Sequence, residues 1–143
     1  MASKSKVCFF FEHKGFSLTN RTKLKLFIES VFRTYNTKLK SINYIFTTDK
    51  RLLEINKQYL NHDYYTDIIT FDLSDSNRTT AEVYISVDRV KENAKKNKVT
   101  FRHELYRVIF HGVLHLCGFN DKTKKEINRI RETEDCLIEK YTK

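Results

Sequence analysis

Two histidines, His111 and His115, are embedded in an otherwise apolar stretch at residues 108–118, VIFHGVLHLCG. A spacing of four residues places both imidazoles on one face of a helix, one turn apart, so their ring nitrogens can converge on one metal ion. Such pairs also occur by chance, and a histidine in a protein core is more often hydrogen-bonded than metal-bound. The pair by itself therefore marks a candidate metal site on a central buried helix.

A carboxylate follows the two histidines closely. Gly118 stands where a helix C-cap residue with positive φ is wanted, and the turn after it is expected to bring Asp121 back towards the imidazoles. Two neutral imidazoles and one carboxylate, with a fourth position left to water, make up a catalytic zinc site rather than a closed structural one. We therefore predict that His111, His115 and Asp121 bind a metal ion and carry the catalysis.

Gly112 lies between the two histidines in the middle of the same predicted helix. A glycine there costs about 1 kcal/mol relative to alanine, so we expect another backbone or a substrate to approach closely. The alternative is a plain packing contact of the helix. Glycine also occupies the position where HExxH metalloproteases carry their general base, which disfavours peptide hydrolysis by that route.

The hydrophobic pattern predicts the elements that position these residues. Alternating or β-branched runs predict strands at 7–11, 41–47, 67–73 and 80–87. Apolar residues at helical spacing predict helices at 24–35, 49–60, 87–97, 100–117 and 123–141. Asp49 is placed to cap the second of these helices. Because this order mixes a hairpin with crossover connections, it predicts an α+β fold, a mixed sheet of about four strands with helices packed on it.

The chain has 143 residues, a length typical of one domain, and no low-complexity linker divides it. We therefore expect residues 1–143 to form a single domain. No apolar run is long enough for a membrane span, no signal peptide is recognisable, and the three cysteines lack CxxC spacing. These features predict a cytoplasmic protein with no membrane partner and no disulfide framework.

The formal net charge of +9 is unevenly distributed. Residues 1–60 hold 12 basic and 4 acidic side chains, residues 61–88 hold 1 and 6, and residues 89–143 hold 14 and 8. A lysine-rich solvated surface and a surface that attracts polyanions such as RNA both fit this distribution. Charge alone does not choose between them.

Three segments resemble a known family. Residues 111–121, HGVLHLCGFND, resemble the signature HGxLHLxGYDH of the YbeY endoribonucleases, the bacterial rRNA maturation factors. Residues 66–71, TDIITF, resemble the family's TDVLSF strand, and residues 81–86, AEVYIS, resemble its GDIxIS strand. In order and spacing the resemblance runs from about Leu52 to the end of the chain.

This resemblance implies a small α+β metal-dependent hydrolase that cuts single-stranded RNA, acts in 16S rRNA 3′-end maturation and takes part in ribosome quality control. Its implied partners are single-stranded rRNA and the ribosome or its small subunit. The implied ligands of one Zn²⁺ per chain are His111, His115 and Asp121. Asp121 stands where the family usually has a third histidine, and its harder oxygen leaves another divalent metal possible.

Two further positions bear on the site. Leu60 stands where the family commonly has an arginine that serves the phosphate, and His62 and Arg78 are candidates to supply the lost charge. Glu104 lies seven residues before His111, two helical turns away, where it could hydrogen-bond a ligand imidazole or simply pair with a surface lysine.

Two alternative functions differ from the nuclease hypothesis. The substitutions at Leu60 and Asp121 fit a ribosome-assembly RNA-binding module that retains the metal site and cleaves weakly or not at all. The positive charge also fits a metallohydrolase that acts on a small anionic phosphoester.

Overall fold

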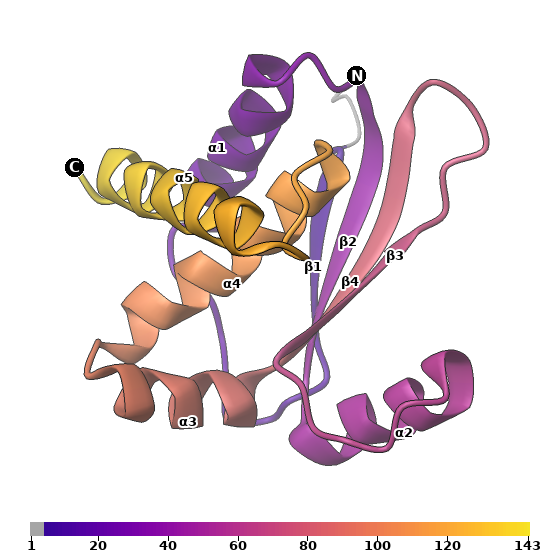
Figure 1. Ribbon diagram of the computed structural model, residues 1–143, viewed down its shortest axis with the longest axis vertical. Coiled ribbons are helices and arrows are strands. Elements are labelled where there is room, and N and C mark those ends of the chain that lie inside the picture. Colours follow the sequence, from indigo (N-terminus) through magenta and orange to yellow (C-terminus); the bar gives the residue numbers. More distant parts are fainter. Residues whose placement is uncertain (1–4) are drawn as a thin grey trace.

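The computed structural model describes residues 5–143, and within them the order of strands and helices is the one that the sequence predicts (Figure 1). The strands are β1 (Val7–Phe11), β2 (Leu39–Thr47), β3 (Ile68–Asp72) and β4 (Thr79–Ser86). The helices are α1 (Arg21–Thr34), α2 (Asp49–Leu60), α3 (Val87–Asn97), α4 (Phe101–Leu116) and α5 (Lys124–Thr142).

The strands form a four-stranded mixed sheet in the order β1-β2-β4-β3. β2 pairs in parallel with both β1 and β4, whereas β3 pairs antiparallel with β4. Parallel neighbours require crossover connections: α1 lies in the connection from β1 to β2, and α2 lies in the connection from β2 to β4. β3 and β4 are joined by a hairpin. The α+β prediction with a mixed sheet of four strands is confirmed.

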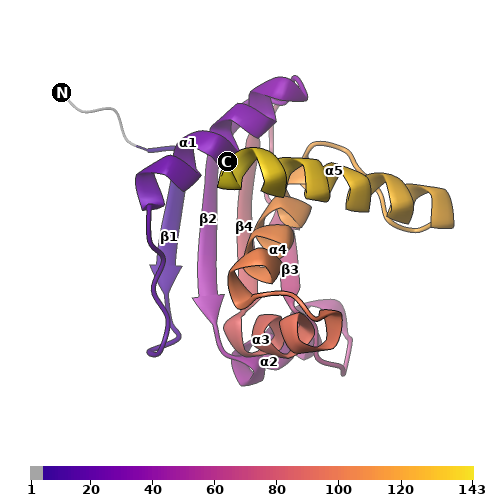
Figure 2. The same cartoon turned by 90° about the vertical axis from the view of Figure 1, so that its left-hand side faces the viewer.

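The sheet is covered unequally on its two faces. α1, α4 and α5 lie on one face, with α4 next to the strands (Figures 1 and 2). The main core fills this side and contains fully buried side chains of α1, β2 and α4, among them Phe32, Tyr44 and Phe110. A smaller cluster of Leu52 and Ile55 with Ile69 packs α2 against β3. None of the helices in residues 5–143 combines the length and apolar character needed to cross a bilayer.

α4 is the central helix, and its glycine is explained by packing. A Cβ at Gly112 would lie 3.1 Å from Ile68 Cδ1, 3.5 Å from Thr70 Oγ1 and 3.6 Å from Val83 Cγ1. These are side chains of β3 and β4, so the helix sits close against the sheet at this point. The expectation of a nearby backbone or substrate is wrong, and the packing alternative is correct.

The N-cap of α2 lies one residue before the one that the sequence predicts. Thr48 is the N-cap, and its side chain accepts a hydrogen bond from the backbone N–H of Arg51. Asp49, predicted as the cap, instead accepts hydrogen bonds from Arg89, at 2.7 Å, and from the hydroxyl of Ser86. The prediction failed because a threonine caps as an aspartate does, while Asp49 has a partner from α3.

Candidate metal centre

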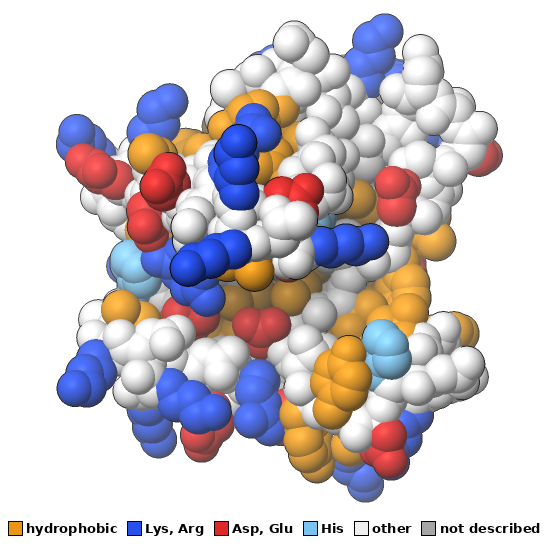
Figure 3. Space-filling view, viewed as in Figure 1, with side chains coloured by type: hydrophobic (Ala, Val, Ile, Leu, Met, Phe, Trp, Pro, Cys, Tyr) orange, Lys and Arg blue, Asp and Glu red, His pale blue; other side chains and the backbone are white. Residues whose placement is uncertain are grey.

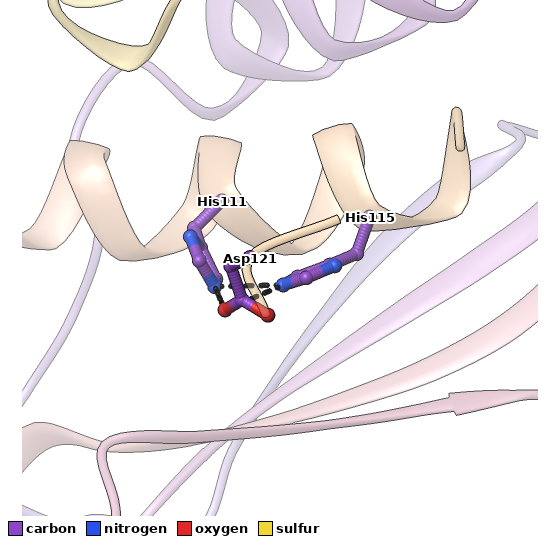
Figure 4. Close-up of side chains that lie close together, drawn as sticks. All are labelled: His111, His115 and Asp121. Atoms are coloured by element: carbon purple, nitrogen blue, oxygen red, sulfur yellow. Dashed lines mark hydrogen bonds and ion pairs between the residues drawn. The ribbon is translucent and has the colours of Figure 1, made fainter. Parts of the chain in front are cut away.

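The end of α4 and the turn after it bring the three predicted ligands together. Gly118 follows the helix with a φ of 99°, in the left-handed region that glycine favours, as the sequence predicted. The reversed chain places Asp121 beside His111 and His115. One potential ligand atom each from His111, His115 and Asp121 lies within 4.8 Å of the others, and the side chains point towards one another (Figure 4).

Each imidazole is held through its Nδ1 atom. The Nδ1–H of His111 donates to Oε2 of Glu134, at 2.6 Å, and the Nδ1–H of His115 donates to the backbone carbonyl of Phe119, at 2.9 Å. Both partners are acceptors, so whenever a ring is neutral its proton resides on Nδ1. The lone pair of each Nε2 atom is then directed into the cluster.

The cluster fits a divalent cation of the zinc type. The two Nε2 atoms are 2.9 Å apart, and Asp121 Oδ2 lies 3.3 Å from His115 Nε2 and 3.6 Å from His111 Nε2. Ligands on a tetrahedron with bonds of about 2.0–2.1 Å are about 3.3–3.4 Å apart, in the middle of this range. Three facing acceptors repel one another unless a proton or a metal cation lies among them. Imidazole nitrogen with carboxylate oxygen is a donor set that zinc accepts.

The surroundings of the cluster are negatively charged. Burial lowers the pKa of His111, but the hydrogen bond to Glu134 and the charges of Glu134, Asp121 and Asp67 outweigh burial, so its pKa is raised. Burial raises the pKa of Asp67, although His111 and a hydrogen bond from Asn93 act in the opposite direction. The field that favours a proton on His111 also favours a metal cation between the ligands.

Glu134 is the supporting carboxylate that sequence reasoning missed. It is 2% exposed, and its other oxygen accepts a hydrogen bond from Arg107, at 2.8 Å. Glu104, the predicted partner of a ligand imidazole, is also buried, but it faces Asn97 at 3.5 Å. Both readings of Glu104 are therefore wrong. No spacing in the sequence could have found Glu134, because α4 and α5 meet only through tertiary packing.

The cluster lies where two grooves meet. One groove, of about 470 Å³, lies between α3, α4 and α5 and contains Arg107 and Arg131. The other, of about 610 Å³, runs beside β3 to the loop after α2 and contains His62 and Tyr64. Both are lined by His111 and by other shared residues, Asp67, Ile68 and Asp121. Figure 3 shows the hollow that separates α5 from α2 and α3, with acidic side chains in its floor.

The two candidates for the missing arginine charge lie in different places. His62 lines the groove that contains the ligands, where its ring stacks on that of Tyr64. Arg78 lines a separate groove together with Lys6, Arg33 and Lys38. The structure therefore brings His62, and not Arg78, to the groove that contains the candidate metal ligands.

Comparison with known proteins agrees with the geometry. The sequence profile of the family described as endoribonuclease YbeY matches residues 11–142. The chain is 41% identical over 137 residues to an endoribonuclease YbeY of Cytophaga hutchinsonii, covering 94% of this chain and 96% of the relative. It is 47% identical over 108 residues to an endoribonuclease YbeY of Parabacteroides distasonis, covering 76% of each chain.

A solved structure shares the fold. The solution structure of a protein from Thermotoga maritima superposes with a TM-score of 0.60 at 28% sequence identity, covering 94% of this chain and 88% of the other. The family profile spans nearly the whole chain, and the relatives align with this chain along most of their own length. This protein therefore belongs to the endoribonuclease YbeY family.

Proposed function

We propose that this protein is a metal-dependent endoribonuclease that cleaves single-stranded RNA, with His111, His115 and Asp121 as ligands of one Zn²⁺ per chain. The observation that carries the proposal is the position of this donor set at the junction of two grooves, in a chain of an endoribonuclease family. The proposed substrate is the 3′ end of 16S rRNA on or near the small ribosomal subunit, with a part in ribosome quality control.

The proposed function also carries expectations about the location of the protein in the cell and about its domain organisation. Because ribosomal RNA is its proposed substrate, we expect the protein to act in the cytoplasm. We expect residues 1–143 to act as one domain, because the ligands on α4 and after it depend on support from α5 and from the sheet.

The chemistry divides between the ion and the chain. When bound, a divalent ion supplies Lewis-acid activation of water and of the phosphodiester. Glu134 and the carbonyl of Phe119 fix both imidazoles with their Nε2 atoms facing the cluster, so little reorganisation is needed during the reaction. The grooves on both sides leave room for the strand to enter and leave.

Arg131 is the side chain that we assign to the phosphate backbone. It is exposed on α5 and lines the groove with His111 and Asp121. Arg107 in the same groove is already paired with Glu134 and Asp135, whereas Arg131 has no ion-pair partner among residues 5–143. A phosphate approaching these carboxylates needs a compensating cation, which Arg131 supplies.

Replacing Arg131 with glutamine is expected to weaken binding of single-stranded RNA by about 5- to 10-fold and to reduce the salt dependence of binding by about one phosphate contact. The measurement is a fluorescence titration of a labelled oligoribonucleotide at several salt concentrations. Arg78→Gln is the matched control, since it removes the same charge from the separate groove. Equal losses in the two variants would show that only net charge matters.

Cleavage of a substrate panel by the purified protein tests the proposed function. We expect cleavage of single-stranded rRNA fragments, little cleavage of the same sequence in a duplex, and little hydrolysis of a small phosphodiester. Faster hydrolysis of the small phosphodiester would favour the alternative metallohydrolase. Bound metal with RNA binding but no cleavage would favour the ribosome-assembly module, to which the substitutions at Leu60 and Asp121 point.

A further inference from the structure

The loop after α2 presents an ordered pair of aromatic rings to the groove. The rings of His62 and Tyr64 are stacked, with centroids 5.0 Å apart and planes inclined by 21°. The hydroxyl of Tyr64 also lies 2.9 Å from Nδ1 of His62, so it can donate a hydrogen bond to the imidazole. Tyr64 is nevertheless 55% exposed. An exposed tyrosine held in one orientation offers a flat apolar face to a ligand.

A buried asparagine anchors this loop. Asn56 of α2 is 1% exposed, and its Nδ2 donates to the backbone carbonyl of Tyr64 at 2.8 Å. The carbonyl of Asn56 accepts a hydrogen bond from the backbone N–H of His62 at 3.1 Å. Asn61, between them, has a φ of 55° and ends the helix. The two rings are therefore placed by the fold before any ligand arrives, which reduces the entropy lost on binding.

The rings of the neighbouring tyrosines Tyr59 and Tyr65 contact side chains outside this pair. The ring of Tyr65 is covered by the guanidinium of Arg89, 4.9 Å from its centroid. The ring of Tyr59 packs edge-on against Phe71, with centroids 6.0 Å apart. Among residues 5–143, the ring of Tyr64 stacks on His62 and on no other aromatic ring, and of these three tyrosines it alone lines the groove that contains His111 and His115.

We propose that the stacked His62 and Tyr64 rings form a platform for one unpaired nucleobase of the RNA, next to the phosphodiester that is cleaved. This inference rests on the proposed function. An aromatic ring stacks on any base, so the platform would add affinity without demanding a particular sequence. A base in a duplex is already stacked and paired, so the platform also gives a physical reason for a preference for single strands.

The test combines protein variants with abasic RNA. We would measure binding and cleavage of a short single-stranded oligoribonucleotide and of a series in which one abasic nucleotide is moved along the strand. Tyr64→Ala should weaken binding of the intact strand by roughly 5- to 100-fold, and Tyr64→Phe should restore most of it. The bound metal should be unchanged in both variants. At one position the abasic substitution should cost the wild type a similar factor and cost Tyr64→Ala almost nothing more.

Tyr59→Ala is the matched control, because it removes a similarly exposed tyrosine from the nearby end of α2, outside the groove. The platform is refuted if Tyr64→Ala binds RNA as Tyr59→Ala does. It is also refuted if, at every abasic position, the abasic substitution weakens binding to Tyr64→Ala as much as it weakens binding to the wild type. In both cases the proposed nuclease function still stands. A wild type that neither binds nor cleaves single-stranded RNA would refute the platform and the proposed function together.

Discussion

Replacing His115 with alanine is expected to remove the bound metal and to lower RNA cleavage by about 100-fold or more. The variant loses one of three convergent ligand atoms and leaves the lone pair of His111 Nε2 opposite only Asp121. Metal activation of water and phosphate contributes several kcal/mol, and each 1.4 kcal/mol corresponds to a factor of ten in rate. Metal content by elemental analysis and cleavage of a labelled RNA should be measured on the same samples.

His103→Ala is the control for this variant, since His103 lies on α4 outside the ligand cluster. It should retain metal and activity. Circular dichroism and thermal unfolding should show that both variants are folded, because His115 is partly exposed at the end of the helix. Equal cleavage by wild type and His115→Ala would indicate a contaminating nuclease or a different active site.

Replacing Glu134 with glutamine is expected to lower metal affinity by about 10- to 100-fold, although Glu134 lies on a different helix and is not one of the three predicted ligands. The carboxylate accepts the Nδ1–H of His111 and thereby fixes the ring and increases the basicity of Nε2. Glutamine keeps the shape and one acceptor oxygen but removes the charge. Competition with a fluorescent chelator measures the change in metal affinity directly, independent of cleavage.

Asp135→Asn is the matched control for Glu134→Gln. Both carboxylates pair with Arg107, but Asp135 is exposed and does not contact His111. Glu134→Gln should also lower the free energy of unfolding by about 1–3 kcal/mol, because Arg107 loses its buried anionic partner and keeps only the exposed Asp135. Similar metal affinities in the two variants would show that Glu134 supports the fold through Arg107 and not the ligand His111.

Local sequence determined most of the fold. The apolar periodicity of each element lies within its own residues, so strands and helices were predicted in the correct order and close to their observed ends. The three proposed ligands were found for the same reason. His111 and His115 share a helix face, and Gly118 reverses the chain within a few residues, so Asp121 returns without help from distant segments.

Tertiary packing decided the remainder. Whether Gly112 faces a substrate or a strand depends on how α4 lies across the sheet, and Ile68 and Thr70 occupy that space. Glu134 supports His111, and Glu104 does not, because α5 crosses α4 beside the imidazole. Contacts between elements depend on their relative placement, and the periodicity of one element carries no information about the helix that will cross it.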